Sequence, residues 1–368
     1  MNILLVTNSF YPSQIGGPAN TLYWHAKALN DKGFNVTVIT TTLGIKERHN
    51  IKADQWLTSE NYKIIYCKSR LRAVYEAYKC YNKFDVIHLS SIFFYPSIAV
   101  GFFCFLSNKN VFWSPRGECS SMALIYSVWK KKPVLQFLKI ISKKTLFHAT
   151  SSKETEEIKK VFSFAKIIEI PNYLYLEKVY KEKVKRQLLF VGRVHPIKAL
   201  ENLFIATTLS AEFLANHFTL QIVGSAPFQE DYLEKLKEFV KELKMEDRIQ
   251  FLGHIDGVEK DIKYAESYCL MLPSHTENFG NVVIESLNQG TPVIASKNTP
   301  WEILEKYGAG MHVSNQPDEL AKAINKIISL SDGCYELTRA NAYKLCKEQF
   351  SIEDNIKKWT DVYSISNH

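Results

Sequence analysis

The feature that most constrains the fold of this chain is an alternation of short apolar runs with longer segments of helical periodicity. In the first half the apolar runs cover residues 3–7, 35–41, 63–67, 84–89, 111–114 and 148–150. Strands that alternate with helices indicate βαβ units, in which parallel strands form a sheet and helices cover its faces. The sequence therefore predicts an α/β fold with a doubly wound parallel sheet.

The same alternation starts again in the second half of the chain. Its apolar runs cover 187–191, 220–223, 249–252, 269–272, 293–295 and 311–313. A Lys- and Glu-rich segment, 173–186, separates the halves and is the expected linker, and a length of 368 residues suits about two domains. We predict one domain over 1–172, a second over 187–348 and a C-terminal helix over 349–368, in which Trp359 and Tyr363 supply apolar contacts.

Charge is distributed unevenly between the two halves. The net charge is +8, yet residues 1–170 hold 23 Lys and Arg against 11 Asp and Glu, whereas the remainder holds 23 against 27. A basic half paired with an acidic half predicts that the first domain faces something anionic.

Cysteine usage and the N-terminal residues bear on the compartment. The seven cysteines, at 67, 80, 104, 119, 269, 334 and 346, never form a C-x-x-C pair, which argues against a disulfide framework or a zinc site. The apolar run at the N-terminus is short and lacks a basic leader, so it is typical of a first strand rather than a signal peptide. We expect a cytoplasmic protein.

Two glutamates eight positions apart, Glu277 and Glu285, mark the most informative motif. The apolar run 269–272 ends at Pro-Ser, Phe279-Gly280 follows, and 282–287 begins a helical pattern. Ligands bind at such strand–loop–helix units in open α/β sheets, where the first helix amides are free to donate hydrogen bonds. Two carboxylates there can accept hydrogen bonds from vicinal hydroxyls. The alternative is an ordinary helix N-terminus, where acidic residues are favoured by the helix dipole.

With Gly-Thr-Pro-Val at 290–293, the motif resembles the donor site of retaining glycosyltransferases of the GT4 family. The resemblance implies the GT-B fold: two Rossmann-like domains that face each other across a cleft, with the C-terminal helix crossing back to the first. The first domain would bind the acceptor and the second the nucleotide sugar. By the same resemblance, Glu277 contacts the transferred sugar or its developing charge, Glu285 holds ribose hydroxyls, and backbone groups of Asn278, Phe279, Gly280, Asn281 and Val282 bind sugar and phosphate.

A basic clamp precedes this motif. The apolar run 187–191 leads into Gly192-Arg193, and Lys198 follows at the next helix start, an arrangement similar to the family's Gly-Arg…Lys-Gly signature with Ala199 in place of glycine. Arg193 can bind two phosphate oxygens and Lys198 adds a point charge. Both would stabilise the diphosphate as the glycosyl bond breaks. The alternative is a surface Arg and Lys beside a turn. No Asp-x-Asp occurs, so we expect metal-independent transfer from a UDP- or GDP-sugar and no cofactor.

Other positions are weaker candidates. Gly16 and Gly17 lie between the first strand and helix, where bare backbone leaves room for phosphate or sugar. By resemblance, Gly224 lines the cleft and Ile255 binds the base, while His254 is expected to be structural.

Ser114-Pro115-Arg116-Gly117 resembles a subgroup that makes bacterial surface polysaccharides, such as LPS O-antigen or capsule. Arg116 could meet the donor phosphate or an acceptor group, or be a structural arginine paired with Glu118 or another acid. His25, His88 and His148 are expected to be structural.

The segment 127–144 holds six lysines and no acid, with Trp129, Val134, Phe137, Leu138 and Ile141 at helical spacing. It suits a helix on an anionic membrane surface, which would give access to a lipid-linked saccharide acceptor. An amphipathic core helix with a solvated lysine face is the alternative.

For the whole chain, three alternatives stay open beside the glycosyltransferase: a nucleotide-sugar 2-epimerase, a glycoside phosphorylase and a non-catalytic nucleotide-sugar-binding protein. Nothing indicates a nucleic-acid partner.

Overall fold

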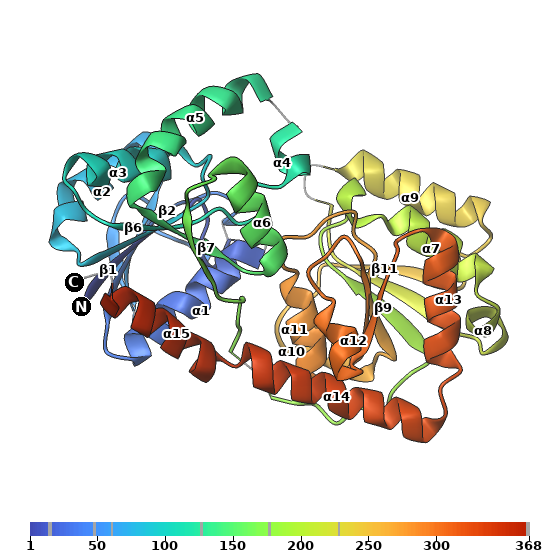
Figure 1. The fold of residues 1–368 in the computed structure, drawn as a ribbon. Coiled ribbons are helices and arrows are strands. Elements are labelled where there is room, and N and C mark those ends of the chain that lie inside the picture. The colour runs from blue at the N-terminus through green and yellow to red at the C-terminus, as the bar shows by residue number, and fades with distance from the viewer. Residues whose placement is uncertain are drawn as a thin grey trace. The chain divides into compact units, whose positions relative to one another are not determined.

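The computed structural model describes residues 1–13, 17–46, 49–59, 62–125, 128–175, 178–226 and 229–365. The chain forms two compact units (Figure 1). Unit 1 consists of Met1–Tyr173 together with Ile352–His368, and unit 2 consists of Leu174–Ser351.

Unit 1 is built on an eight-stranded sheet with the order β3-β4-β2-β1-β5-β6-β7-β8. All neighbouring strands are parallel except β3 and β4. The antiparallel β3 was not predicted, because three half-buried or exposed residues carry no periodic signal. The strands are β1 (Asn2–Val6), β2 (Asn35–Thr41), β3 (Trp56–Thr58), β4 (Lys63–Cys67), β5 (Val86–Ser90), β6 (Val111–Ser114), β7 (Thr145–Ala149) and β8 (Lys166–Glu169).

Alternating side chains of this sheet enter two separate cores. On β1, Leu4 and Val6 belong to one core, and Ile3 and Leu5 belong to the other. Four helices close the first core: α2 (Arg70–Cys80), α3 (Tyr95–Leu106), α5 (Val128–Ile141) and α6 (Ser152–Val161). Two helices close the second: α1 (Gly17–Asp31) and α15 (Ile352–Ile365). Short helices complete the unit: η2 (Tyr81–Lys83), α4 (Ser121–Ile125) and η3 (Ser142–Lys144).

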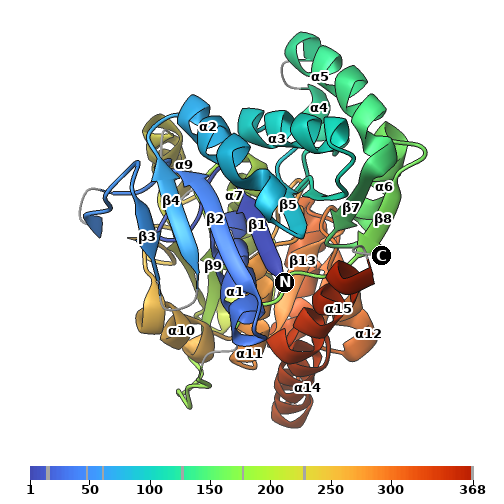
Figure 2. The ribbon, with the colours of Figure 1, turned by 90° about the vertical axis from the view of Figure 1, so that its left-hand side faces the viewer.

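The C-terminal helix α15 belongs to unit 1 and packs beside α1 (Figure 2). Trp359 and Tyr363 are buried in the core that α1 and α15 share. The Tyr363 hydroxyl also shares hydrogen bonds with His25 Nε2, at 2.9 Å, and with His88 Nδ1, at 2.7 Å. The last helix of the chain is therefore held in unit 1 by both apolar and polar contacts.

Unit 2 is built on a six-stranded, fully parallel sheet with the order β11-β10-β9-β12-β13-β14. The strands are β9 (Gln187–Val191), β10 (Thr219–Val223), β11 (Ile249–Gly253), β12 (Cys269–Leu272), β13 (Val293–Ser296) and β14 (Gly310–Val313). All six coincide with predicted apolar runs. The chain adds β10 and β11 on one side of β9 and β12 to β14 on the other, so the direction of winding switches between β9 and β12.

The helices of unit 2 form two groups. One group shares a core with the sheet: α7 (Leu200–Leu209), α8 (Ala211–Ala215), α9 (Glu230–Glu242) and α13 (Pro317–Ile328). The members of the other group pack against one another: α10 (Gly257–Glu266), α11 (Asn281–Asn288), α12 (Ile303–Tyr307) and α14 (Asp332–Phe350). A short helix η4 (Pro196–Lys198) follows β9. Within the described residues, no helix combines the length and apolar character that crossing a bilayer requires.

Candidate functional site

The predicted acid and base residues of unit 2 meet at the carboxyl edge of its sheet, where the winding switches. Arg193 and Lys198 lie in the connection after β9, and Glu277 lies in the loop after β12. Because β9 and β12 are neighbours whose following connections diverge, this edge is the position at which open α/β sheets bind ligands.

The two connections are joined by an ion pair and by a backbone hydrogen bond. Lys198 Nζ contacts Glu277 Oε1, and the two side chains are only 14% and 15% exposed. The Ser274 hydroxyl donates to the same carboxylate oxygen over 3.1 Å, and the His275 amide donates to the Ile197 carbonyl over 2.8 Å. The described residues thus hold the Glu277 carboxylate through Oε1.

The turn that carries Lys198 is shaped by its neighbours. His195 Nδ1 accepts a hydrogen bond from the Ile197 amide at 3.1 Å and so caps η4. Burial and the positive charges of Arg193 and Lys198 hold the pKa of His195 below its usual value, which keeps the ring neutral and able to accept this bond. Ala199 then takes a left-handed conformation, with φ of +51°, before α7 begins. A glycine would hold this conformation without steric cost, which explains why the related motif has glycine there.

Arg193 is exposed beside this turn, next to a region of closely packed backbone. The Gly192 amide donates to the Val223 carbonyl over 2.9 Å, which ties the ends of β9 and β10 together. A Cβ on Gly224 would lie 1.7 Å from the Gly192 carbonyl oxygen. Close backbone packing alone therefore requires glycine at 224, and its predicted contact with a ligand stays a prediction.

The start of α11 is fixed by aromatic packing. Gly280 has a φ of +90°, and the preceding Phe279 packs against Trp301 and Phe350 with ring centroids 5.1 and 5.9 Å away. Trp301 Nε1 also donates to the Phe279 carbonyl over 2.5 Å. The Phe279 side chain thus points into the core, and only its backbone could meet a ligand. Three further predicted contact residues of this turn are half-buried: Asn278, Asn281 and Val282.

Glu285, on α11, is held by two residues of α10 that the sequence analysis missed. Glu285 Oε2 accepts a hydrogen bond from the Tyr264 hydroxyl at 2.8 Å and lies 3.0 Å from Lys260 Nζ. Burial alone would lower the pKa of Lys260, but the Glu285 carboxylate outweighs burial and raises it. Burial and the same carboxylate raise the pKa of Tyr264 well above its usual value. The i, i+4 spacing of Lys260 and Tyr264 in a helical pattern was the available signal.

Ile255 follows β11, the edge strand of the same sheet, and is half-buried. The neighbouring His254 is exposed, and its Nε2 lies 3.2 Å from Asp256 Oδ2. The Gly224 amide donates to the Gly253 carbonyl over 2.7 Å, so the ends of β10 and β11 are joined as well. Ile255, the residue predicted to contact the nucleobase, therefore follows a strand at the same edge of the sheet as the Lys198–Glu277 pair.

In unit 1, Gly16 lies outside the described residues and Gly17 is the first residue of α1. Arg116 has a φ of +57° and donates from Nη1 to Asn172 Oδ1 over 3.1 Å. Burial lowers its pKa, although Glu154 opposes that shift. Glu118 is not its partner, because the Glu118 carboxylate accepts hydrogen bonds from the Ser91 hydroxyl and from the amides of residues 92 and 93. Glu154 is another acid that acts on Arg116, so a structural arginine stays open.

A chain of hydrogen bonds links the three buried histidines of unit 1. His25 bonds the hydroxyls of Tyr173 and Tyr363, at 2.6 and 2.9 Å, and the Ser114 hydroxyl connects His88 to His148 at 2.7 and 2.8 Å. His148 Nε2 reaches the Ile170 carbonyl at 2.8 Å. The predicted structural role of these histidines is confirmed. Beside them Arg116 lines a cavity of about 10 Å³, which suits one water molecule.

The described residues contain no group of three or more His, Cys, Asp or Glu side chains placed to hold a metal ion. What they do contain, in unit 2, is a doubly wound sheet with a Lys–Glu pair at its switch point and a second anchored glutamate on the following helix. Open α/β sheets bind their ligands at such a switch point.

Comparison with known proteins gives the class a name. Residues 175–344 match the family model described as glycosyl transferases group 1. A 41.2 kDa protein of the cps region of Klebsiella pneumoniae is 26% identical over 308 residues, which cover 77% of this chain and 79% of that protein. The O-antigen chain mannosyltransferase RfbU of Salmonella typhimurium is 28% identical over 183 residues, about half of each chain.

Among solved structures, Anabaena HepE in complex with UDP-glucose matches with a TM-score of 0.77 at 19% identity and covers 99% of both chains. This likeness confirms the predicted two-domain α/β fold of the GT-B type. The match over 175–344 and the glycosyltransferases among its relatives identify the chain as a glycosyltransferase. The predicted enzyme class is therefore confirmed.

Proposed function

We propose that this enzyme transfers a sugar, with retention of anomeric configuration, from a nucleotide-diphosphate sugar to a saccharide or lipid-linked saccharide. The reaction would contribute to the synthesis of a cell-surface polysaccharide. The enzyme would act in the cytoplasm. The observation that carries it is the Lys198–Glu277 pair at the β9/β12 switch point of a group 1 domain. The relatives named for a cps region and for O-antigen mannosyl transfer support the polysaccharide context.

Arg193 and Lys198 are assigned to the diphosphate. Cleavage of the glycosyl–oxygen bond leaves negative charge on the departing nucleoside diphosphate, and cations fixed in advance stabilise that charge more in the transition state than in the ground state. Lys198 is fixed by Glu277, while Arg193 is exposed and can turn towards an incoming phosphate. This assignment needs no metal ion.

The two glutamates are assigned to the sugar rings of the donor. Each uses one carboxylate oxygen for protein contacts that the structure describes: Oε1 of Glu277 for Lys198 and Ser274, and Oε2 of Glu285 for Tyr264 and Lys260. The other oxygen of each can accept hydrogen bonds from hydroxyls. We assign Glu277 to the transferred sugar and Glu285 to the ribose, as the resemblance implies, with backbone groups of residues 278–282 on sugar and phosphate.

The donor is best identified by thermal-shift screening of the full chain with UDP-, GDP- and ADP-sugars. A UDP-sugar is the first candidate, because the structural neighbour HepE was solved with UDP-glucose. The nucleotide sugar that binds is then used in a transfer assay with and without EDTA, and NMR reads the anomeric configuration of the product. Metal-independent retention is expected, and inversion or EDTA-sensitive transfer would contradict the proposal.

Glu277→Gln tests the assignment of the first glutamate. The change keeps the size of the side chain but removes the charge that Lys198 contacts and that a developing positive charge on the sugar would meet. Turnover should fall by at least about 100-fold, in the range found for lost transition-state contacts. The matched control is Glu259→Gln, an exposed change on α10 of the same unit, which should retain full activity.

A further inference from the structure

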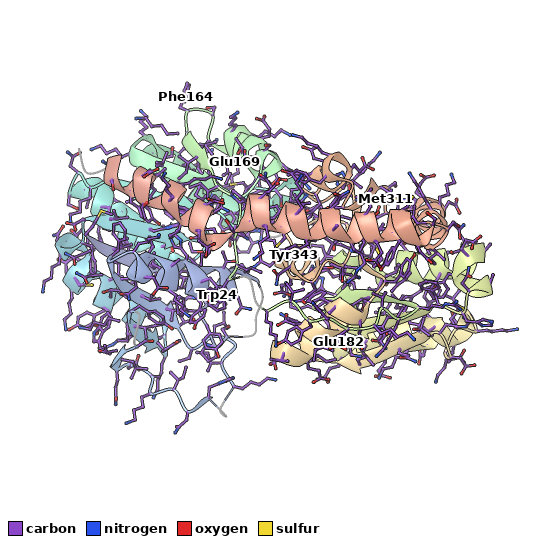
Figure 3. All side chains as sticks on the ribbon, turned by 90° about the horizontal axis from the view of Figure 1, so that it is seen from below. Trp24, Phe164, Glu169, Glu182, Met311 and Tyr343 are labelled. Atoms are coloured by element: carbon purple, nitrogen blue, oxygen red, sulfur yellow. The ribbon has the colours of Figure 1, made fainter. Side chains whose placement is uncertain are left out.

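The outer surface of unit 1 carries an unusual density of exposed apolar side chains. The described residues expose twenty-two large apolar side chains, and eleven of these lie between Leu71 and Ile140. Isolated cases elsewhere, such as Phe164 in the loop between α6 and β8 (Figure 3), are ordinary for a protein surface. A concentration of half of them in about a fifth of the chain requires an explanation.

These side chains occur at helical spacing on the outward faces of their helices. On α2, Leu71, Tyr75 and Tyr78 are 70%, 47% and 60% exposed, whereas Ala73 and Ala77 face the core. Surface helices usually place charged residues on the solvent side. On α2, large apolar side chains share the solvent side with Arg70 and Lys79, and small residues face the core.

The neighbouring helices extend the same surface. Phe102 and Leu106 of α3 are 37% and 67% exposed, and Val128, Trp129 and Ile140 of α5 are 53%, 74% and 58% exposed. The three helices lie side by side over one face of the sheet (Figure 2). Aromatic contacts join them, since Tyr78 of α2 meets Phe103 of α3 and Phe102 meets Phe137 of α5. We call this surface the α2–α3–α5 face.

The charge on this face has one sign. Residues 69–153 hold thirteen Lys and Arg and three acids. Glu76 is buried and takes hydrogen bonds from Trp56 and Arg72, and the Glu118 carboxylate is taken by the Ser91 hydroxyl and two backbone amides. The third acid, Asp85, accepts a hydrogen bond from the Asn2 amide at the start of β5. Exposed lysines remain on α2, α5 and η3: Lys79, Lys132, Lys139 and Lys143.

We propose that the α2–α3–α5 face docks on an anionic lipid surface, with its aromatic and aliphatic side chains in the headgroup region and its lysines against acidic headgroups. Large apolar side chains mixed with lysines, on three helices whose one acid, Glu76, is buried, match such a surface in both polarity and charge. The sequence predicted a membrane-binding surface only over 127–144. The structure adds the exposed faces of α2 and α3 to that surface. The inference does not use the proposed transfer reaction, and its test measures lipid binding without any substrate.

The test is flotation of the full chain with phosphatidylcholine vesicles that contain or lack phosphatidylglycerol, at low and high salt. Binding is expected only with phosphatidylglycerol and only at low salt. The Lys132→Glu/Lys139→Glu/Lys143→Glu variant should lose at least about tenfold in vesicle partitioning. A matched control, Lys235→Glu/Lys241→Glu/Lys297→Glu, makes the same charge change at exposed positions of unit 2 and should bind as the parent does.

A second variant separates the three-helix face from α5 alone. Leu71→Ser/Tyr75→Ser changes two exposed side chains of α2 and keeps the contact of Tyr78 with Phe103, so thermal unfolding should be unaffected while vesicle binding falls. Full binding by this variant would restrict the surface to α5 and overturn the proposal as stated. Other results would also overturn it: no flotation of the parent chain, equal binding to neutral vesicles, equal loss in the control, or a dimer on gel filtration that dissociates in this variant.

Discussion

The Tyr264 hydroxyl donates a 2.8 Å hydrogen bond to Glu285 Oε2, and Lys260 Nζ lies 3.0 Å from the same oxygen. Two residues of α10 thereby hold the carboxylate that we assign to the ribose. Tyr264→Phe should raise the KM for the donor about fivefold with little change in kcat, because a positioning bond contributes about 1 kcal/mol to binding of substrate and transition state alike. Steady-state kinetics with varied donor checks this.

The control for Tyr264→Phe is Tyr232→Phe. The Tyr232 hydroxyl also donates to a glutamate, Glu201 Oε2, over 2.8 Å, but neither residue is assigned to the donor. Its removal should leave the KM unchanged. An equal rise in KM in both variants would mean that Tyr264 acts through general stability and not through Glu285.

Gly224 should not tolerate a side chain. A Cβ there would lie 1.7 Å from the Gly192 carbonyl oxygen, and the residue has a φ of +150°. Gly224→Ala should lower the free energy of unfolding of unit 2 by at least about 3 kcal/mol. Gly333→Ala is the matched control, because a Cβ on Gly333 meets nothing within 4 Å and the residue lies in α14, so a small gain of up to about 1 kcal/mol is expected. Urea denaturation measures both.

Ala199 should accept glycine but not a branched side chain. Its φ of +51° costs a residue with a Cβ about 1 kcal/mol in steric repulsion. Glycine avoids this repulsion, but its unfolded chain has more conformational entropy to lose, at a similar cost. Ala199→Gly should therefore change the free energy of unfolding by less than about 0.5 kcal/mol. Ala199→Val should destabilise by at least about 2 kcal/mol, since β-branched residues hardly enter this region. Equal stability of the two variants would contradict the left-handed conformation.

The alternation of apolar and polar segments was sufficient to predict every strand of the unit 2 sheet, because buried parallel strands need continuous apolar runs. In unit 1 it missed β3 and β8, the two strands at the edges of the sheet. The paired glutamates and the Gly-Arg…Lys turn were likewise visible, since they lie where strands end. Their partners were not. The i, i+4 spacing of Tyr264 and Lys260 places them on one face of a helix, but they reach Glu285 only because α10 packs on α11, which that spacing does not show. The histidine chain, which depends on Tyr363 from α15, could not be predicted for the same reason.

Unit 1 should lose stability in acid through its buried histidines. Burial, with a contribution from Arg116, lowers the pKa of His25 to about 3, and burial also lowers the pKa of His88 and His148 well below the usual value. In the unfolded chain these rings take up protons near pH 6.5, and in the folded chain they do not. Stability is therefore complete above about pH 6.5 and falls as the pH drops towards the folded values, by up to about 1.4 kcal/mol per pH unit for each histidine.

Chemical denaturation between pH 7.5 and 5 measures this slope. His148→Asn should reduce the slope, whereas His254→Gln, which alters an exposed histidine, should leave it unchanged. Stability independent of pH over this interval would contradict the neutral state of the histidine chain.

The most direct test of the account is calorimetric titration of the full chain with the nucleoside diphosphate of its donor, UDP being the first choice. We predict that Arg193→Ala and Lys198→Ala each weaken binding by at least about tenfold, in line with the loss of a charged phosphate contact. Lys235→Ala, an exposed change in the same unit, should bind as the parent does. Unchanged affinity in the Lys198→Ala variant would contradict a diphosphate site at the end of β9.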